Sequence, residues 1–229
     1  MRFATQVYRQ LGWKIFAETF PDRARRPWMK LREIEIIQEV LGNLKPQRCL
    51  EWGAGYSTLF FPSMLSKGAQ WISMEHDFEW FGKIKNLNRS PNVHIEHVPA
   101  DNLQWGAEHG DEQSLDFKTY IQFPRKFGKF DFILVDGMAR CGCLVQALDL
   151  IGDKGLVVLH DANRNYYHEP LKLYKGQILF TDFRAGLGGL WIGGKSKDVD
   201  GTLNLDFHQK VWQLYNTAGK DKIGQLLRL

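Results

Sequence analysis

Short apolar runs that do not alternate with polar residues constrain the fold of this chain more than any other feature. Five of them follow one another in the sequence: Arg48–Glu51, Trp71–Glu75, Val93–Val98, Phe130–Asp136 and Gly155–Asp161. Strands buried on both faces have this pattern, because helices cover both sides of a parallel sheet. Longer amphipathic stretches, including 78–87 and 141–151, lie between the runs and supply the crossover connections. The pattern predicts an α/β chain with a mostly parallel sheet.

A closing hairpin is predicted after these runs. Two further β-prone segments, Gln177–Phe183 and Leu190–Gly193, are joined by the short glycine-rich connection Arg184–Gly189. Short connections rich in glycine are typical of antiparallel hairpins. We therefore expect a Rossmann-like sheet with helices on both faces, in which the last strand runs against the others.

The chain of 229 residues is long enough for one domain with short additions. We expect an N-terminal helical segment at 1–45, a core domain at 46–195 with an insertion at 102–128, and a C-terminal helical extension at 196–229. The sequence contains no run of about 18 apolar residues, the length expected of a membrane-spanning helix. No secretory signal is recognisable at the N-terminus. Three cysteines are too few for a disulfide framework. These features favour a cytoplasmic protein.

The net charge of +4 permits an anionic partner without requiring one. Basic residues cluster around Trp28, and we interpret them as a solvated helix face paired with Glu33 and Glu35. The sequence contains no recognisable RNA-binding module, so no nucleic-acid partner is expected. The N-terminal helices and aromatic residues leave room for a homodimer.

The most informative motif is a glycine turn between the first strand and the following helix. The strand ends near Glu51, Gly53 and Gly55 follow, and the helix begins with Ser57–Thr58. Glycines let the backbone turn sharply and approach a ligand closely. Glu75 ends the next strand, 24 positions after Glu51, near the spacing expected for a carboxylate that binds ribose hydroxyls. The motif indicates a nucleoside cofactor.

Two details favour S-adenosylmethionine over a dinucleotide. Thr58 stands where the dinucleotide fingerprint has its third glycine. We expect Glu51 to point toward the ligand, where it would repel a pyrophosphate and attract an ammonium or sulfonium group. An NAD-dependent oxidoreductase remains an alternative, as does a non-catalytic domain that binds a nucleoside cofactor.

The sequence resembles class I S-adenosylmethionine-dependent methyltransferases, especially small bacterial-type members. The segments that carry the resemblance are Leu50–Thr58, Met74–Asp77, Val135–Gly137 with Arg140, and Leu159–Asp161 with Arg164. The resemblance covers about residues 30 to 195 and implies a seven-stranded sheet with a reversed last strand. The sequence departs from the family motif at Ser57, where many members have glycine, although a serine at a helix start can still form a hydrogen bond.

The resemblance also implies roles for single residues. It places Glu51, Gly53 and Gly55 at the methionine part of the cofactor, Glu75 at the ribose, Asp101 beside Asn102 at the adenine amino group, and Asp136 beside Gly137 at the methionine ammonium or the acceptor. Independently, the rings of His76 and Trp80 could stack on the adenine. Ser57 and Thr58 complete the expected cofactor contacts.

Candidate catalytic residues follow the fourth and fifth strands. Asp136, His160 and Asp161 end these strands, where ligand chemistry is expected in α/β sheets. His160 is a candidate general base, and Arg140 could hold an anionic group of the acceptor. Some O-methyltransferases bind Mg²⁺ through an adjacent Asp-Asn pair, but here the asparagine is displaced to Asn163, so we expect no metal. We predict methyl transfer to an oxygen or nitrogen of a small-molecule acceptor.

Overall fold

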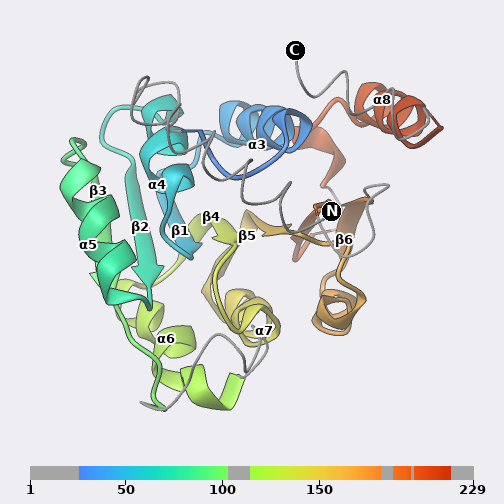
Figure 1. Cartoon of the computed structure of the whole chain (residues 1–229). Coiled ribbons are helices and arrows are strands. Elements are labelled where there is room, and N and C mark those ends of the chain that lie inside the picture. The colour runs from blue at the N-terminus through green and yellow to red at the C-terminus, as the bar shows by residue number, and fades with distance from the viewer. Residues whose placement is uncertain (1–25, 103–113, 182–187, 197–198, 218–229) are drawn as a thin grey trace, which may run out of the picture.

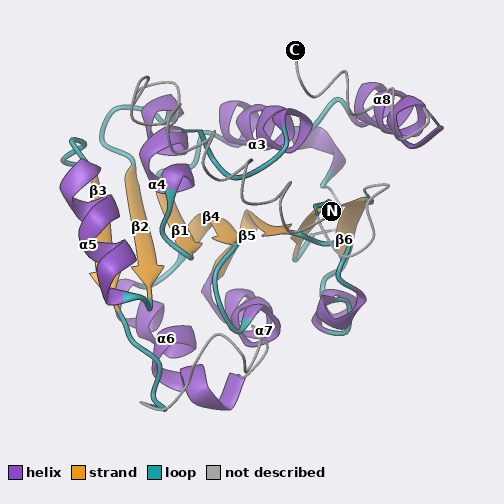
Figure 2. Ribbon diagram, viewed as in Figure 1, coloured by secondary structure: helices purple, strands orange, loops and turns teal. Residues whose placement is uncertain are grey.

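The computed structural model describes residues 26–102, 114–181, 188–196 and 199–217. Its centre is one seven-stranded sheet between layers of helices (Figures 1 and 2). The strands are β1 (Arg48–Trp52), β2 (Gln70–Glu75), β3 (Val93–His97), β4 (Phe130–Val135), β5 (Ile151–His160), β6 (Gly176–Phe180) and β7 (Leu190–Gly194). Their order across the sheet is β3-β2-β1-β4-β5-β7-β6.

The last strand in the sequence is inserted between β5 and β6 in the opposite direction. The pairs formed by β1 to β5 are parallel, whereas β7 is antiparallel to both of its neighbours. The predicted mostly parallel sheet with a reversed last strand is confirmed. The predicted fifth strand is longer than expected, because β5 begins at Ile151, directly after the preceding helix.

Helices cover both faces of the sheet. They are α3 (Leu31–Leu44), α4 (Tyr56–Phe60), α5 (Phe78–Leu87), α6 (Lys118–Gln122), α7 (Arg140–Leu150) and α8 (Leu205–Thr217). Side chains of α3 pack in one core cluster with Trp71 and Phe132, whereas side chains of α6 and α7 pack in the other with Trp52. Figure 1 shows α3 and α4 on one side of the sheet and α6 and α7 on the other.

Strand alternation divides the side chains of β1 between these two cores. Successive side chains of a strand point to opposite faces. Leu50 and Trp52 therefore pack on the α7 side, and Cys49 packs on the α3 side. Glu51 points to the same side as Cys49, and this direction decides its role below.

The additions on either side of the core are only partly described. Helix α3 buries Ile36, Ile37 and Val40 against the sheet. Phe117 and Tyr120, from the predicted insertion, are fully buried in the α7-side core. The helix predicted near the N-terminus, the first part of the insertion and the end of the C-terminal extension lie outside the described residues. Within the described ranges, the helices are too short or too polar to cross a bilayer.

Candidate functional site

A cavity of about 590 Å³ opens at the carboxyl ends of β1, β2 and β4. In open α/β sheets, ligands bind at this edge, where the strand order reverses. The cavity joins the glycine turn to residues that follow β2 and β4. Its lining consists of Trp28, Gly53, Ala54, Gly55, Tyr56, Ser57, Glu75, His76, Asp77, Trp80, Asp136, Gly137, Met138 and Arg140.

Two glycines form the floor of this cavity. Gly53 has φ +97°, and a Cβ placed on it would lie 2.6 Å from the Cα of Gly137. A Cβ on Gly137 would lie 2.3 Å from the hydroxyl of Tyr120 and 2.7 Å from the nitrogen of Gly53. The loops after β1 and β4 therefore touch through their backbones, which only glycine permits. Gly55 is different, because its backbone is extended and a Cβ placed on it would lie 3.7 Å from the nearest atom, the Ser57 hydroxyl oxygen.

The expectation that Glu51 lines the cofactor site is wrong for this structure. Its side chain is fully buried under the turn on the α3 side of the sheet. Ser57 Oγ donates to Oε1 at 2.5 Å, while Thr58 Oγ1 at 2.5 Å, Trp71 Nε1 at 2.8 Å and Ser73 Oγ donate to Oε2. Thr58 Oγ1 also accepts from the backbone nitrogen of Gly55 at 2.9 Å. Glu51 therefore supports the glycine turn from beneath, and its charge cannot discriminate between cofactors by direct contact.

Glu51→Gln should destabilise the protein by about 1–3 kcal/mol at pH 5, because an amide offers fewer acceptor positions than the carboxyl group to the four donors around it. Burial raises the pKa of Glu51 to about 7, although its four hydrogen bonds lower the pKa. The raised pKa means that its contribution to the free energy of unfolding decreases from about pH 4.5 to about pH 7. Urea unfolding at several pH values tests this, with the exposed Glu169→Gln as control. Equal stability of the two variants would contradict the buried network.

Glu75 lies where the sequence predicts a ribose-binding carboxylate. It ends β2, lines the cavity and is 4% exposed. Its Oε1 accepts from the backbone nitrogens of His76 and Asp77, both at 2.8 Å, and lies 2.9 Å from Nδ1 of His76. Its Oε2 forms no hydrogen bond with the described part of the chain. These bonds fix the carboxyl group while one oxygen remains for a ligand.

Three other predicted cofactor contacts do not line the cavity. Asp101 is exposed, and its Oδ2 accepts from the backbone nitrogen of Thr119 at 2.9 Å near the start of α6. Asn102 is also exposed and donates to Asp116 at 3.2 Å. Thr58 is fully buried beneath the turn. The Asp101 carboxylate therefore holds the segment after β3 to the start of α6, 18 positions further along the chain.

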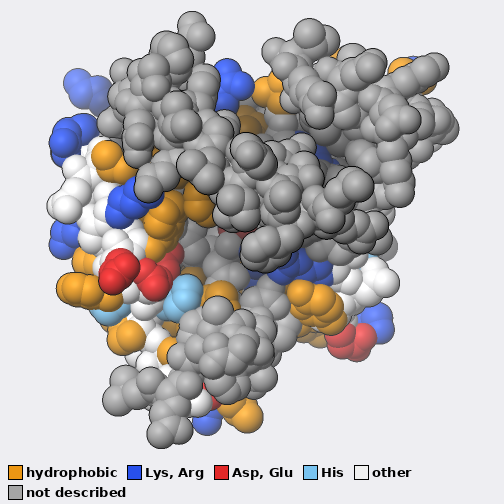
Figure 3. Space-filling view, viewed as in Figure 1, with side chains coloured by type: hydrophobic (Ala, Val, Ile, Leu, Met, Phe, Trp, Pro, Cys, Tyr) orange, Lys and Arg blue, Asp and Glu red, His pale blue; other side chains and the backbone are white. Residues whose placement is uncertain are grey.

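Three aromatic rings from separate segments form one wall of the cavity. Trp28 lies 5.2 Å from Trp80 and 5.9 Å from Tyr56 between ring centroids, and Trp80 lies 5.9 Å from Tyr56. The Trp80 indole donates to the carbonyl of Ala54 at 2.7 Å, which fixes this wall to the glycine turn. Trp28 is 68% exposed. Figure 3 shows acidic and histidine side chains beside hydrophobic ones over the end of β2.

The structure also revises the predicted role of His160. Its Nδ1 lies 2.9 Å from Oδ1 of Asp136, and its Nε2 lies 3.2 Å from Oε2 of Glu33. Burial alone would lower the pKa of His160, but the two carboxylates outweigh it and raise the pKa to about 10. Both ring nitrogens face carboxylates and His160 does not line the cavity, so the structure does not favour its predicted role as a general base.

Arg140 lines the cavity but directs its donors to the backbone. Nε donates to Gly137 O at 2.9 Å, while the two terminal nitrogens donate to His160 O at 2.7 Å and Asp136 O at 3.1 Å. These bonds hold the ends of β4 and β5 together. The structure therefore does not favour the predicted role of Arg140 as a clamp for an anionic acceptor.

Asp161 does not line the cavity. It has φ +57°, its Oδ1 accepts from Gly188 N at 2.7 Å, and its Oδ2 lies 3.0 Å from Arg164. Burial alone would raise the pKa of Asp161, but the nearby His160, Arg140 and Arg164 cations and the Gly188 hydrogen bond lower it. These contacts connect the end of β5 to the segment that precedes β7, which is a structural role.

Sequence reasoning missed two buried residues beside the site. Glu33 is fully buried, although we expected it on a solvated helix face. Its spacing from Ile36, Ile37 and Val40 places it on the apolar face of α3, and that spacing could have revealed it. The hydroxyl of Tyr120 is buried directly under Gly137 and has no hydrogen-bond partner in the described structure. No sequence signal marked Tyr120 as more than a core residue.

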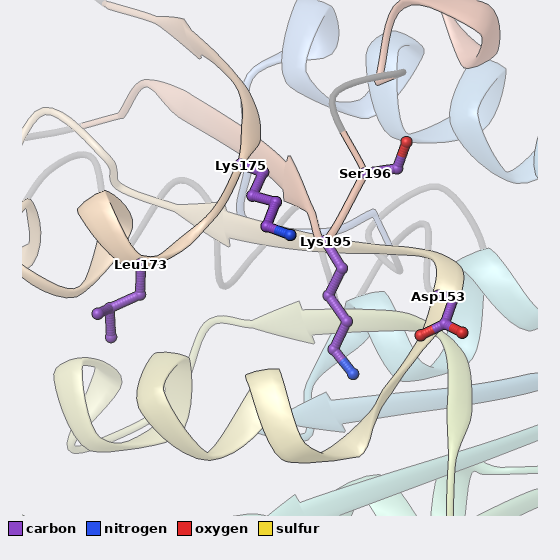
Figure 4. Close-up of a pocket in the computed structure, with 5 residues that line it drawn as sticks. All are labelled: Asp153, Leu173, Lys175, Lys195 and Ser196. Carbon is purple, nitrogen blue, oxygen red and sulfur yellow. The ribbon is translucent and has the colours of Figure 1, made fainter.

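A second hollow, of about 370 Å³, lies away from this edge of the sheet. Figure 4 shows its lining side chains Asp153, Leu173, Lys175, Lys195 and Ser196. Lys195 donates to the carbonyl of Ile151 at 2.9 Å. The hollow therefore lies at the beginning of β5, opposite the strand ends where cofactors bind. Among the described residues, no group of three or more His, Cys, Asp or Glu side chains is arranged to hold a metal ion.

Comparisons with known proteins identify the fold. No protein-family model and no curated protein matches the sequence. An O-methyltransferase from Bacillus cereus, solved in complex with SAH, is 15% identical with a TM-score of 0.53, covering 80% of this chain and 91% of its own. A methyltransferase-like protein from Silicibacter pomeroyi is 18% identical with a TM-score of 0.51, covering 83% and 98%. Spermidine synthase from Thermotoga maritima is 14% identical with a TM-score of 0.51, covering 85% and 75%.

The fold is that of class I S-adenosylmethionine-dependent methyltransferases. Two features of the cavity fit the cofactor of that fold. The Gly53–Gly137 floor lets a ligand approach the backbone closely. Glu75 has an oxygen available for ribose hydroxyls.

Proposed function

We propose that this protein is an S-adenosylmethionine-dependent methyltransferase. The observation that carries the proposal is the reversed β7 in a sheet whose switch-point cavity contains Glu75. Dinucleotide-binding Rossmann domains use six strands in the order 3-2-1-4-5-6. The sheet order therefore supports a methyltransferase over an NAD-dependent oxidoreductase, and it replaces the charge argument from Glu51.

The residues that hold the cofactor in this proposal line the described cavity. Glu75 binds the ribose hydroxyls, and the turn formed by Gly53 and Gly55 holds the methionine part. Asp136 lines the same cavity, and in this proposal its carboxylate contacts the methionine ammonium. His76, which lies 5.6 Å from Phe117 and 6.3 Å from Tyr120 between ring centroids, borders the adenine.

The acceptor is a small molecule in this proposal. When bound, S-adenosylmethionine supplies an activated methyl group on a sulfonium centre. The chain must then align the nucleophile with that methyl group. The cavity volume and its mixed lining fit small-molecule sites, which combine apolar walls with a few fixed polar groups. The wall formed by Trp28, Tyr56 and Trp80 orients an acceptor that receives the methyl group on oxygen or nitrogen.

Calorimetry with S-adenosylhomocysteine and with NAD tests the cofactor assignment. We expect binding of S-adenosylhomocysteine and none of NAD; the reverse result would contradict the proposal. Incubation with isotope-labelled S-adenosylmethionine and a library of hydroxyl and amine acceptors then tests transfer. Binding of the cofactor without any labelled product would favour a non-catalytic domain.

Glu75→Ala should weaken S-adenosylhomocysteine binding by about 1–3 kcal/mol, because the ribose hydroxyls lose their acceptor. Glu79→Ala is the matched control, since Glu79 is exposed in the first turn of α5, four residues further along. Calorimetry of both variants gives the difference directly. Equal affinity of the two variants would mean that another residue holds the ribose.

A further inference from the structure

A chain of charges with alternating sign runs from α3 to the segment after β5. Its links join Glu33 to His160 at 3.2 Å, His160 to Asp136 at 2.9 Å, Asp136 to Arg140 at 3.3 Å, Arg140 to Asp161 at 3.9 Å, and Asp161 to Arg164 at 3.0 Å. Three carboxylates and three cations balance one another. Such pairing offsets the large cost of burying single charges.

The hydrogen bonds of Glu33 determine the state of His160. Oε1 of Glu33 accepts from Gly189 N at 2.8 Å, and Oε2 accepts from Lys30 N at 2.8 Å. Both oxygens therefore act as acceptors, as in a carboxylate. A carboxylate offers no proton, so each ring nitrogen of His160, facing Glu33 and Asp136, must donate one. His160 is held as an imidazolium by geometry.

This cation fixes the orientation of Asp136. His160 Nδ1 and a terminal nitrogen of Arg140 both contact Oδ1 of Asp136. Oδ2 forms no hydrogen bond with the described part of the chain, although Asp136 lines the cavity. One oxygen is thus immobilised by two cations, and the other remains for a ligand.

We propose that Glu33 and His160 are positioning residues that hold Asp136 with one carboxylate oxygen presented to the cofactor, so that α3 is part of the cofactor-binding apparatus. This inference rests on the proposed function, because it assumes that the ligand carries a cationic group at Asp136. It assigns roles to two residues that do not line the cavity.

Helix α3 contains a matched control. Glu39 also binds a histidine, with its Oε2 2.6 Å from Nε2 of His208, but neither residue lines the cavity. Glu33→Gln and His160→Gln should each raise the Kd for S-adenosylhomocysteine about tenfold, the typical effect of a lost hydrogen bond to a charged group. Glu39→Gln and His208→Gln should leave the Kd within about twofold, even where they lower the Tm. The Kd and Tm of all four variants should be measured by calorimetry.

The outcomes separate this inference from the proposed function. A wild-type protein that does not bind S-adenosylhomocysteine overturns both. Wild-type binding with an unchanged Kd in Glu33→Gln and His160→Gln overturns the positioning role alone, as does an equal rise in the two control variants. If the first two variants do not fold, ¹⁵N NMR of the wild-type histidines decides. The doubly protonated ring should shift on ligand addition, and an unperturbed ring contradicts the proposal.

Discussion

Gly53→Ala should destabilise the protein by roughly 3 kcal/mol or more and abolish binding of S-adenosylhomocysteine. The substitution adds two costs. A φ of +97° is strained for any residue with a Cβ. In addition, the new Cβ would lie 2.6 Å from the backbone of Gly137, which has no flexible end to move away. Relief of this clash requires the loops after β1 and β4 to separate, which opens the cavity floor.

Gly55→Ala is the control for this prediction. The residue belongs to the same turn, but its backbone is extended, and the new Cβ would lie 3.7 Å from the nearest atom, the Ser57 hydroxyl oxygen. We expect a free energy of unfolding within about 1 kcal/mol of the wild type, since alanine restricts the unfolded chain. Urea unfolding and calorimetry compare the two variants. Equal stability would show that the two loops do not meet as described.

The sheet could be predicted from the sequence because its signals are local. Non-alternating apolar runs mark buried strands wherever they occur, and the glycine-rich connection before Leu190 marks a hairpin without reference to any partner. The edge of the sheet at which the cavity lies can be predicted from the same signals, since the carboxyl ends of parallel strands lie together. For this reason Gly53, Glu75, Asp136 and Gly137 were predicted at one cavity and lie there.

The direction of single side chains could not be predicted in the same way. Glu51 and Trp52 are neighbours in the motif, yet they point to opposite faces of the sheet. The donors that hold Glu51 include Trp71 and Ser73 on β2, and they become partners only through the register of β1 against β2. A charge argument that uses only the motif cannot see these donors. The motif predicts the position of the cavity correctly and misplaces its carboxylate.

The role of His160 depends on a contact between residues that are even further apart in the sequence. Its partner Glu33 is 127 positions away in the sequence. A histidine at the end of a strand suggests a base when it is considered alone. A histidine between two carboxylates is a cation instead, and only the packing of α3 against the end of β5 places the second carboxylate there. Long-range ion pairs of this kind leave no periodic signal in the sequence.

The buried imidazolium has a measurable consequence for stability. The pKa of His160 is about 10 in the folded protein, against about 6.5 in the unfolded chain. The folded state therefore keeps a proton that the unfolded state releases as the pH rises through this range. The contribution of His160 is fully present below pH 6.5 and is lost as the pH approaches 10. We expect the free energy of unfolding to decrease steadily between pH 7 and pH 9.

Between pH 7 and pH 9, the effect of His160 on the free energy of unfolding can be separated from the effects of other buried groups. The contribution of Glu51 changes below about pH 7, where its raised pKa lies. Burial also raises the pKa of Cys49 and Tyr174, but their unfolded-state values of 9.0 and 10.0 place their effects above pH 9. His160→Gln should therefore be less stable than the wild type at pH 7 and show a flatter dependence up to pH 9. A slope as steep in this variant as in the wild type would contradict the assignment of the proton to His160.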